Sequence, residues 1–244
     1  MTSSVWAVGK HGKVYFVEGR SVTAVPAPAM KHVSAGGAGV WAVAKNGNAY
    51  FREGITSLNP KGTKWVKVSG RLRQVDSGPS GVVYAVGRDG NARCRAKITG
   101  NKPEGSFWRT VNSPSYMSYV SCGSFGCWAS DSRARVWFRD GVSKYNCRGT
   151  KWERVSGSLN QLEVGEHGDV WGIHSSSTLW HRKFISADHP VGKGWRRVGS
   201  FGFKHVTVGM RGLFVVTDQG NAYRKHVCKN GKILSGIVCF IFCW

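Results

Sequence analysis

The feature that most constrains this chain is a repeat of about 43 residues. Each copy begins with the motif Val-Trp-Ala-Val or a close variant, and a second aromatic-type position follows nine residues after the first aromatic. After a shorter first interval, the lead aromatic residues stand 43 or 44 positions apart: Trp6, Trp41, Tyr84, Trp128, Trp171 and Phe214. A fixed period of this length indicates a fold built from similar supersecondary units that pack on one another.

Each period has the composition of four short β-strands. Its apolar segments are rich in Val and aromatic residues, and they are separated by turn formers such as Asn46-Gly47 and Asp89-Gly90. Four strands in about 43 residues is typical of one propeller blade. We therefore predict an all-β protein, a six-bladed β-propeller of four-stranded antiparallel blades.

The strands expected from the motifs do not fill six blades. The chain opens with the last two strands of a blade and continues with five blocks of four. We therefore predict that the N- and C-terminal strands share the last blade. Residues 1–231 are expected to form a single propeller domain, and residues 232–244 an apolar tail that is either an atypical closing strand or a non-native extension. The apolar part of this tail, about 12 residues, is too short to span a bilayer, so no transmembrane segment is expected.

The charge of the chain is strongly positive. Thirty-five Lys and Arg residues against 13 Asp and Glu residues give a formal net charge of +22. Such an excess favours an anionic partner, such as a sulfated or phosphorylated glycan (heparin is one example), nucleic acid or an acidic membrane surface. A basic surface that serves only solubility is the alternative interpretation.

We find no pattern that indicates catalysis. The sequence lacks His-Glu-x-x-His, Gly-x-Ser-x-Gly and phosphate-loop motifs, and it has few carboxylates to act as acid and base. The single Cys-x₄-Cys pair and the scattered histidines do not make a zinc site. We therefore predict no enzyme activity, no catalytic residues, no cofactor and no metal.

One column of the repeat is cationic in five of six copies. Val17 occupies it in the first copy, and the others are Arg52, Arg95, Arg139, Arg182 and Lys225. Propeller symmetry would arrange these side chains as a ring that grips a repetitive anionic polymer through several weak contacts. The alternative is that each is a solvated residue on an outer strand, where charge protects the sheet edge from aggregation.

The tryptophans form two groups. The first, Trp6, Trp41, Trp128 and Trp171, lies in apolar runs and is predicted to pack between blades. The second follows Gly-containing turns and has Lys or Arg nearby: Trp65, Trp108, Trp152 and Trp195. Rings of the second group could stack on sugars, although packing is the usual role of such large aromatic side chains.

The chain resembles the tectonin-repeat family of β-propeller lectins. The likeness runs from Val5 to Lys225 and rests on the Val-Trp-Ala/Gly-Val and Gly-x-x-Trp-x-x-Val units. The run from Val120 to Trp128, followed by Cys147, is similar to the cysteine-bearing repeat of fish egg lectins. The resemblance implies secreted, non-enzymatic binding of N-acetylglucosamine-containing glycans and lipopolysaccharide, on microbial or egg surfaces, in innate or egg defence.

The cysteines suggest disulfides. Cys122 and Cys127 flank a Gly-Ser-Phe-Gly turn, so adjacent strands could bring them within bonding distance. The resemblance, with the expected closeness of neighbouring blades, also implies a bond between Cys94 and Cys147. One of the seven cysteines is left over if the others pair. The alternative is a set of buried free thiols in a reducing compartment.

Localisation follows from the resemblance, which implies secretion. The residues from Met1 onward contain no secretory signal, and we expect the chain to be incomplete. The same observation, together with the charge, supports a second hypothesis, an intracellular basic propeller scaffold that binds proteins or nucleic acid.

Overall fold

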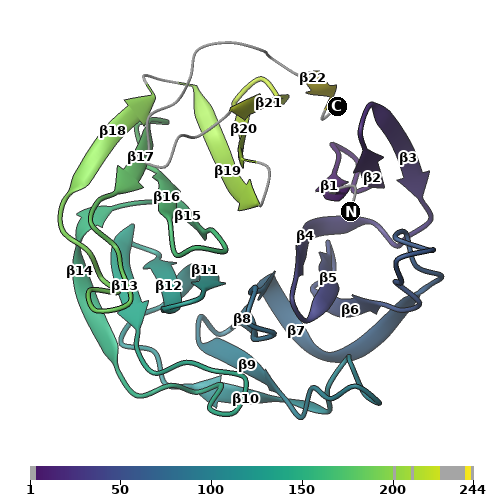
Figure 1. Cartoon of the computed structure of the whole chain (residues 1–244), viewed down its shortest axis with the longest axis horizontal. Coiled ribbons are helices and arrows are strands. Elements are labelled where there is room, and N and C mark those ends of the chain that lie inside the picture. Colours follow the sequence, from purple (N-terminus) through teal and green to yellow (C-terminus); the bar gives the residue numbers. More distant parts are fainter. Residues whose placement is uncertain (1–3, 200–201, 210–211, 226–239, 243–244) are drawn as a thin grey trace.

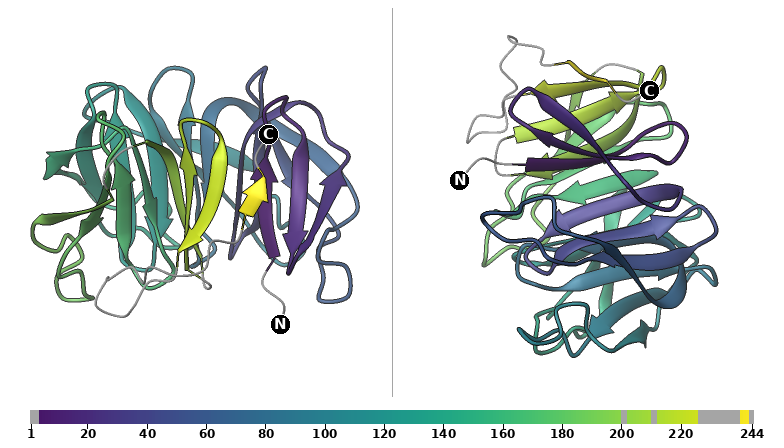
Figure 2. Two further views of the ribbon diagram at one scale, coloured as in Figure 1. Left: turned by 90° about the horizontal axis from the view of Figure 1, so that it is seen from above. Right: turned by 90° about the vertical axis from the view of Figure 1, so that its right-hand side faces the viewer.

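The computed structural model describes residues 4–199, 202–209, 212–225 and 240–242, and this part of the chain contains strands and no helix. The sheets follow one another around a central axis (Figure 1). From the side, the molecule is a thick disc whose strands run between its two faces (Figure 2). No described segment has the helical length and apolar character needed to cross a membrane.

All neighbouring strands are antiparallel, and the sheets follow the sequence order. The first sheet has β1 (Ser4–Val8), β2 (Val14–Glu18) and β3 (Ser21–Val25). The second has β4 (Met30–Gly36), β5 (Gly39–Ala44), β6 (Asn48–Arg52), β7 (Trp65–Ser77), β8 (Val83–Gly87), β9 (Ala92–Ala96) and β10 (Phe107–Val111). The third has β11 (Met117–Gly123), β12 (Gly126–Asp131), β13 (Arg135–Arg139) and β14 (Trp152–Ser158), and the fourth has β15 (Gln161–Val164), β16 (Val170–Ile173), β17 (Leu179–Arg182) and β18 (Trp195–Gly199). The last has β19 (Phe203–Gly209), β20 (Gly212–Thr217), β21 (Asn221–Lys225) and β22 (Phe240–Phe242).

The long strand β7 explains the seven-stranded sheet. Its first part pairs with β6 and its second part, from Leu72 to Ser77, pairs with β8. Gly70 lies between the two parts with φ +113°, and a Cβ there would stand 2.8 Å from the indole nitrogen of Trp108. Only glycine combines this backbone conformation with such a close contact. The sheet therefore consists of two four-stranded units that share one bent strand.

The core lies between neighbouring sheets. Trp41, Trp128 and Trp171 are buried, as is Tyr84 at the same position of the repeat. The cluster around Trp128 includes Val155 of its own sheet and residues of the next sheet. The predicted packing role of the lead tryptophans is confirmed, and the half-buried Trp6 packs edge-on against Phe16 and Trp65.

The prediction for the termini is wrong in the described residues. We expected the two termini to share a sheet, but β22 pairs with β21 in the last sheet, and β1 pairs only with β2. The opening sheet also has a third strand, β3, because a tight turn lets Ser21–Val25 return along β2. By pairing with β21, β22 stays at the edge of the sheet that precedes it in sequence, which closes a shorter loop than crossing to β1 would. The tail residues 232–239 lie outside the described part of the chain.

Candidate functional site

Two belts of polar side chains line the inner strands. The first belt is formed by His32, Gln74, Tyr119, Gln161 and His205, which occupy equivalent positions in five inner strands. The Tyr119 hydroxyl lies 2.9 Å from Nε2 of His32 and 3.3 Å from Nε2 of His205. Each glutamine bonds to both the backbone N–H and the carbonyl of one residue in the next sheet. These bonds fix the register of adjacent sheets.

The second belt lies two residues further along and contains Ser34, Asp76, Ser121, Glu163 and Thr207. Asp76 accepts a hydrogen bond from the Cys122 N–H at 2.8 Å and one from the Ser34 hydroxyl at 3.1 Å. Burial raises the pKa of Asp76 to about 7 and also raises the pKa of Glu163, because the low-dielectric interior disfavours both negative charges. Among the described residues, no group of three His, Cys, Asp or Glu side chains is arranged to hold a metal.

Asp76 should make the stability of the protein depend on pH. The pKa of Asp76 is raised to about 7 in the folded state. The folded protein therefore keeps the proton of this carboxyl up to about pH 7, whereas the unfolded chain releases it at about pH 4. The free energy of unfolding contributed by this group therefore falls as the pH rises through that window. We expect the free energy of unfolding of Asp76→Asn, taken relative to that of the wild type, to rise by at least about 1 kcal/mol when the pH is raised from 5 to 8.

Urea unfolding at both pH values checks this expectation. The comparison with the variant is needed because burial lowers the pKa of His32 to about 3 and that of His205 to about 4. The two histidines therefore stabilise the fold less as the pH falls below about 6.5. This change has the opposite sign to that of Asp76, which stabilises the fold more as the pH falls. The exposed Asp188→Asn is the control. A constant difference between Asp76→Asn and the wild type at the two pH values would contradict the expectation.

The arginines of the cationic column are internal braces. Each Nε donates a hydrogen bond of 2.7 to 2.9 Å to the carbonyl nine residues later, and each guanidinium lies 5.2 to 5.5 Å from the ring centroid of the tryptophan thirteen residues later. The four arginines are Arg52, Arg95, Arg139 and Arg182, and they are only 5% to 9% exposed. The interpretation as solvated edge residues is therefore wrong, because the loop closes over each guanidinium. A ligand-binding ring stays a prediction, and the side chain of Lys225 lies outside the described part.

The second group of tryptophans packs against the preceding repeat unit. Trp65, Trp108 and Trp195 have ring centroids 5.8 to 6.3 Å from a lead tryptophan of that unit. The indole N–H groups of Trp108 and Trp195 each donate a 2.6 Å hydrogen bond to a serine carbonyl there. Trp152 packs against the cluster that contains Tyr84. Sugar stacking by these four rings stays a prediction.

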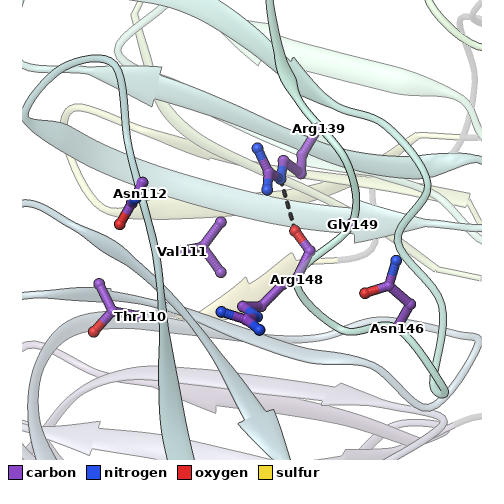
Figure 3. A pocket seen from close by; sticks show the side chains of 7 residues that line it. All are labelled: Thr110, Val111, Asn112, Arg139, Asn146, Arg148 and Gly149. Carbon is purple, nitrogen blue, oxygen red and sulfur yellow. Dashed lines mark hydrogen bonds between the residues drawn. The ribbon is translucent and has the colours of Figure 1, made fainter.

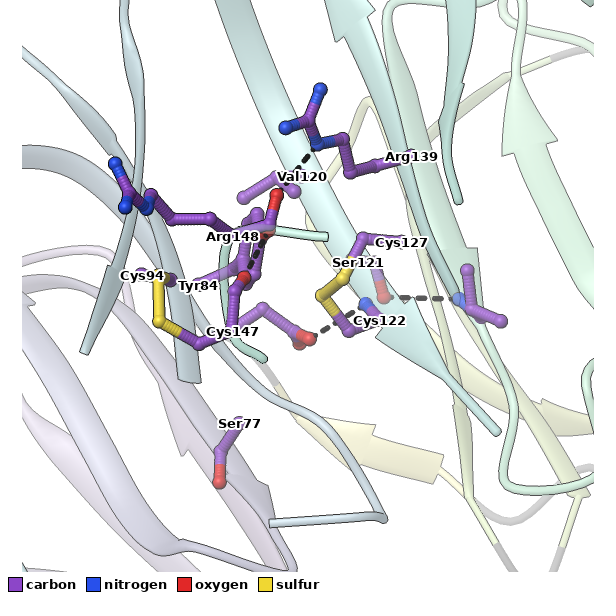
Figure 4. Close-up of a disulfide and its surroundings, with 12 residues drawn as sticks. Ser77, Tyr84, Cys94, Val120, Ser121, Cys122, Cys127, Arg139, Cys147 and Arg148 are labelled. Atoms are coloured by element: carbon purple, nitrogen blue, oxygen red, sulfur yellow. Dashed lines mark hydrogen bonds between the residues drawn. A yellow bond between two sulfur atoms is a disulfide. The ribbon is translucent and has the colours of Figure 1, made fainter. Parts of the chain in front are cut away.

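The structure contains both expected disulfides (Figure 4). Cys122 and Cys127 stand directly opposite each other in the β11–β12 hairpin. The bond between Cys94 and Cys147 joins β9 to the loop between β13 and β14, in the next sheet. The other cysteines, Cys228, Cys239 and Cys243, lie outside the described residues.

A polar cavity of about 280 Å³ opens between these two sheets (Figure 3). One sheet contributes the end of β10 and the residue after it, and the next contributes the end of β13 and the following loop. The lining residues are Thr110, Val111, Asn112, Arg139, Asn146, Arg148 and Gly149. Three anchors hold the loop: the Cys94–Cys147 disulfide, a 2.5 Å bond from the Tyr84 hydroxyl to the Cys147 carbonyl, and the Arg139 bond to the Arg148 carbonyl.

Arg148 gives the cavity its chemistry. Its side chain is exposed, and within the described residues no hydrogen bond or ion pair holds its guanidinium. A free guanidinium suits carboxylate, sulfate or phosphate, and the amides of Asn112 and Asn146 suit sugar hydroxyls. A second cavity, of about 320 Å³, lies between the third sheet and the loop that joins β17 to β18. Its lining includes the carboxylates of Asp140, Glu153 and Asp188, so it suits anions less well.

Sequence reasoning missed Arg148 and Asn146. Lys61, Glu104 and Val191 occupy the position of Arg148 in the other loops, so the repeat gives this position no common chemistry. Cys147 is the signal that could have identified Arg148, because a disulfide between two sheets holds the residues next to its cysteines in place. The inner polar belts were also missed, although their positions recur at fixed distances before a glycine.

Comparison with known proteins supports the fold and places the chain in a family. Among solved structures, the chain is similar to the β-propeller domain of Cps50 (Swd1) from Myceliophteria thermophila, with a TM-score of 0.61, 10% identity and coverage of 95% of this chain and 81% of that one. YCF48 from Cyanidioschyzon merolae gives a TM-score of 0.54 at 13% identity, covering 98% and 85%. These identities support the β-propeller fold alone.

Curated relatives include the fish-egg lectin of Cyprinus carpio, 29% identical over 108 residues, or 43% of this chain and 45% of that protein. The tectonin beta-propeller repeat-containing protein 1 of Mus musculus is 48% identical over 120 residues, or 47% of this chain and 10% of that protein. The chain thus spans less than half of the length of the relatives it matches. The model of the Tectonin domain family matches residues 1–218. The chain therefore belongs to the Tectonin domain family.

Proposed function

We propose that the protein is a lectin that binds glycans without transforming them. Its ligands would be N-acetylglucosamine-type glycans and bacterial lipopolysaccharide or other anionic polysaccharides, in innate or egg defence. The observation that carries the proposal is the cavity beside the Cys94–Cys147 disulfide, where a free guanidinium stands among amide and hydroxyl groups. The fish-egg lectin among the relatives supports it.

The dimensions and charge of the molecule fit this function. A cavity of about 280 Å³ is at the lower limit of small-molecule sites, which suits one or two sugar rings. The net charge of +22 would attract anionic polymers such as heparin and raise their local concentration. We further propose six blades, with β7 serving two of them, and secretion, since disulfides persist in oxidising compartments.

Arg148→Ala should weaken binding of an anionic oligosaccharide at least tenfold. The loss of one charge-assisted hydrogen bond costs about 1.5 to 3 kcal/mol, while an exposed side chain contributes little to stability. Isothermal titration with a carboxylate-bearing N-acetylglucosamine oligosaccharide measures the change. Arg20 is exposed in the turn between β2 and β3, so Arg20→Ala removes the same charge away from the cavity and is the control. Equal weakening in the two variants would contradict the assignment of the cavity.

A second candidate function is an intracellular scaffold that binds nucleic acid or protein through its basic surface. The observation that favours it is the charge of +22, which exceeds what a neutral sugar requires. Binding of this kind depends on counterion release, so its affinity falls steeply with salt and is indifferent to neutral sugars.

A further inference from the structure

Large apolar side chains are exposed on equivalent loops of the molecule. We call the connections between the third and fourth strands of four successive units the rim loops; they comprise residues 53–64, 97–106, 140–151 and 183–194. Leu58 is 97% exposed, Tyr145 is 89% exposed and Phe184 is 72% exposed, and each lies in a different rim loop. Single exposed apolar residues are common on soluble proteins, so the observation gains weight from the equivalent position of the loops and from the charges beside the rings.

The rim loops emerge on one face of the disc. Gln74 bonds to Val120 of the next inner strand, and two residues further on Asp76 accepts a bond from Cys122 of that strand. Gln161 bonds to Val206, and two residues further on Glu163 accepts a bond from the Thr207 hydroxyl. The inner strands of successive units therefore run in the same direction at the same height, and the strands of each unit alternate in direction. Connections between the third and fourth strands must then leave every unit at the same face. A flat partner could contact several of them at once.

Phe184 is held in a conformation that a bulky residue rarely adopts. Its φ is +58°, at a loop position where two other rim loops have Gly54 and Gly141 with φ of +71° and +66° and the fourth has Lys97 with φ of +58°. The left-handed region is unfavourable for a residue that has a Cβ, whereas glycine adopts it without this cost. The exposed ring does not recover this cost through burial. The loop geometry imposes this conformation on all four rim loops, and Phe184 differs from the others by placing an exposed aromatic ring there.

The rim loops are also basic. Each of the four contains more Lys and Arg than Asp and Glu. Lys144 Nζ lies 4.9 Å from the ring centroid of Tyr145, and Lys183 Nζ lies 5.4 Å from that of Phe184. Apolar and aromatic side chains beside lysines are the combination that enters the interface of a bilayer with anionic lipids, where the rings lie at headgroup level and the lysines meet phosphates.

We propose that the rim loops dock the protein face-on to an anionic lipid bilayer. Leu58, Tyr145 and Phe184 enter the headgroup region, and the lysines of the same loops contact lipid phosphates. None of the three apolar residues lines the cavity beside Arg148, and Leu58 and Phe184 lie in rim loops that contribute no residue to it, whereas Tyr145 shares a loop with Asn146 and Arg148. The rim loops give the protein a second mode of attachment to a cell surface.

Vesicle co-sedimentation of the full chain tests the proposal. Vesicles of phosphatidylcholine alone are compared with vesicles that also contain phosphatidylserine. We expect at least tenfold stronger partitioning onto the anionic vesicles. The triple variant Leu58→Ser/Tyr145→Ser/Phe184→Ser should lose at least tenfold of this partitioning, and its melting temperature should not fall, because all three side chains are exposed. Val22→Ser, 54% exposed on β3, is the control and should bind as the wild type does.

Three results would overturn the proposal: no partitioning of the wild type, equal partitioning onto both vesicle types, or full partitioning by the triple variant. Sedimentation velocity adds a further check. A wild-type dimer that becomes a monomer in the triple variant would assign the rim loops to contacts between copies instead. Glycan titration of the double variant Leu58→Ser/Phe184→Ser separates this proposal from the lectin function: both residues lie in loops that do not line the cavity, so we expect weaker partitioning onto anionic vesicles with unchanged glycan affinity.

Discussion

Replacing Cys94 and Cys147 together with alanine should lower the free energy of unfolding by about 4 kcal/mol. The bond joins residues 53 positions apart, and a cross-link over a longer segment removes more conformational freedom from the unfolded chain. The bond also anchors the loop that contains Asn146 and Arg148. We therefore expect the double variant to lose glycan affinity as well as stability.

The matched control is Cys122→Ala/Cys127→Ala. That pair is only 5 positions apart, so the same truncation should cost about 2 kcal/mol and should leave glycan affinity unchanged. Urea unfolding of the two double variants measures both effects. Equal losses, or a larger loss for the hairpin pair, would show that the bond between sheets does not stabilise the fold as described.

The second large effect is expected for Arg95→Ala, at about 3 kcal/mol. Its guanidinium donates to the carbonyls of Glu104 and Gly105 and to the hydroxyl of Ser69 in the first part of β7. It also lies 5.3 Å from the ring centroid of Trp108. Truncation removes these contacts together and leaves buried carbonyls without a donor, which is why the loss exceeds that of one hydrogen bond.

Arg95→Lys separates charge from geometry. Lysine keeps the positive charge but cannot reproduce the planar fork, so we expect it to recover less than half of the lost stability. Arg109→Ala, an exposed arginine in the adjacent strand, should change stability by less than about 0.5 kcal/mol. If Arg95→Ala kept wild-type stability and lost glycan affinity instead, the column would be a ligand-binding ring and not a set of braces.

The repeat predicted much of the fold because spacing and alternation are local properties. Lead aromatics such as Trp41 and Trp128 fall at fixed intervals, and their burial follows from the apolar runs around them. The continuity of β7 could not be predicted, since it depends on a glycine that bends the strand without ending it. The pairing of β22 was also missed, because pairing depends on which sheet edge is nearest.

The candidate site was harder to predict than the fold. A repeated arginine fits a solvated edge, a ligand ring or a buried brace equally well, and only the carbonyls that Arg52 and its equivalents contact decide between these. Arg148 belongs to no repeated pattern, so periodicity could not find it. Polar inner-strand residues such as Asp76 were missed because their partners lie in neighbouring inner strands, more than 40 positions away in sequence.

The most direct test of the lectin function is a salt titration of glycan binding with and without free N-acetylglucosamine. We predict saturable binding at physiological salt that N-acetylglucosamine displaces, because hydroxyl and amide contacts in the cavity survive when long-range attraction is screened. Affinity for heparin or DNA that falls steeply with salt, with no response to N-acetylglucosamine at any salt concentration, would contradict it. That result would establish the basic scaffold instead.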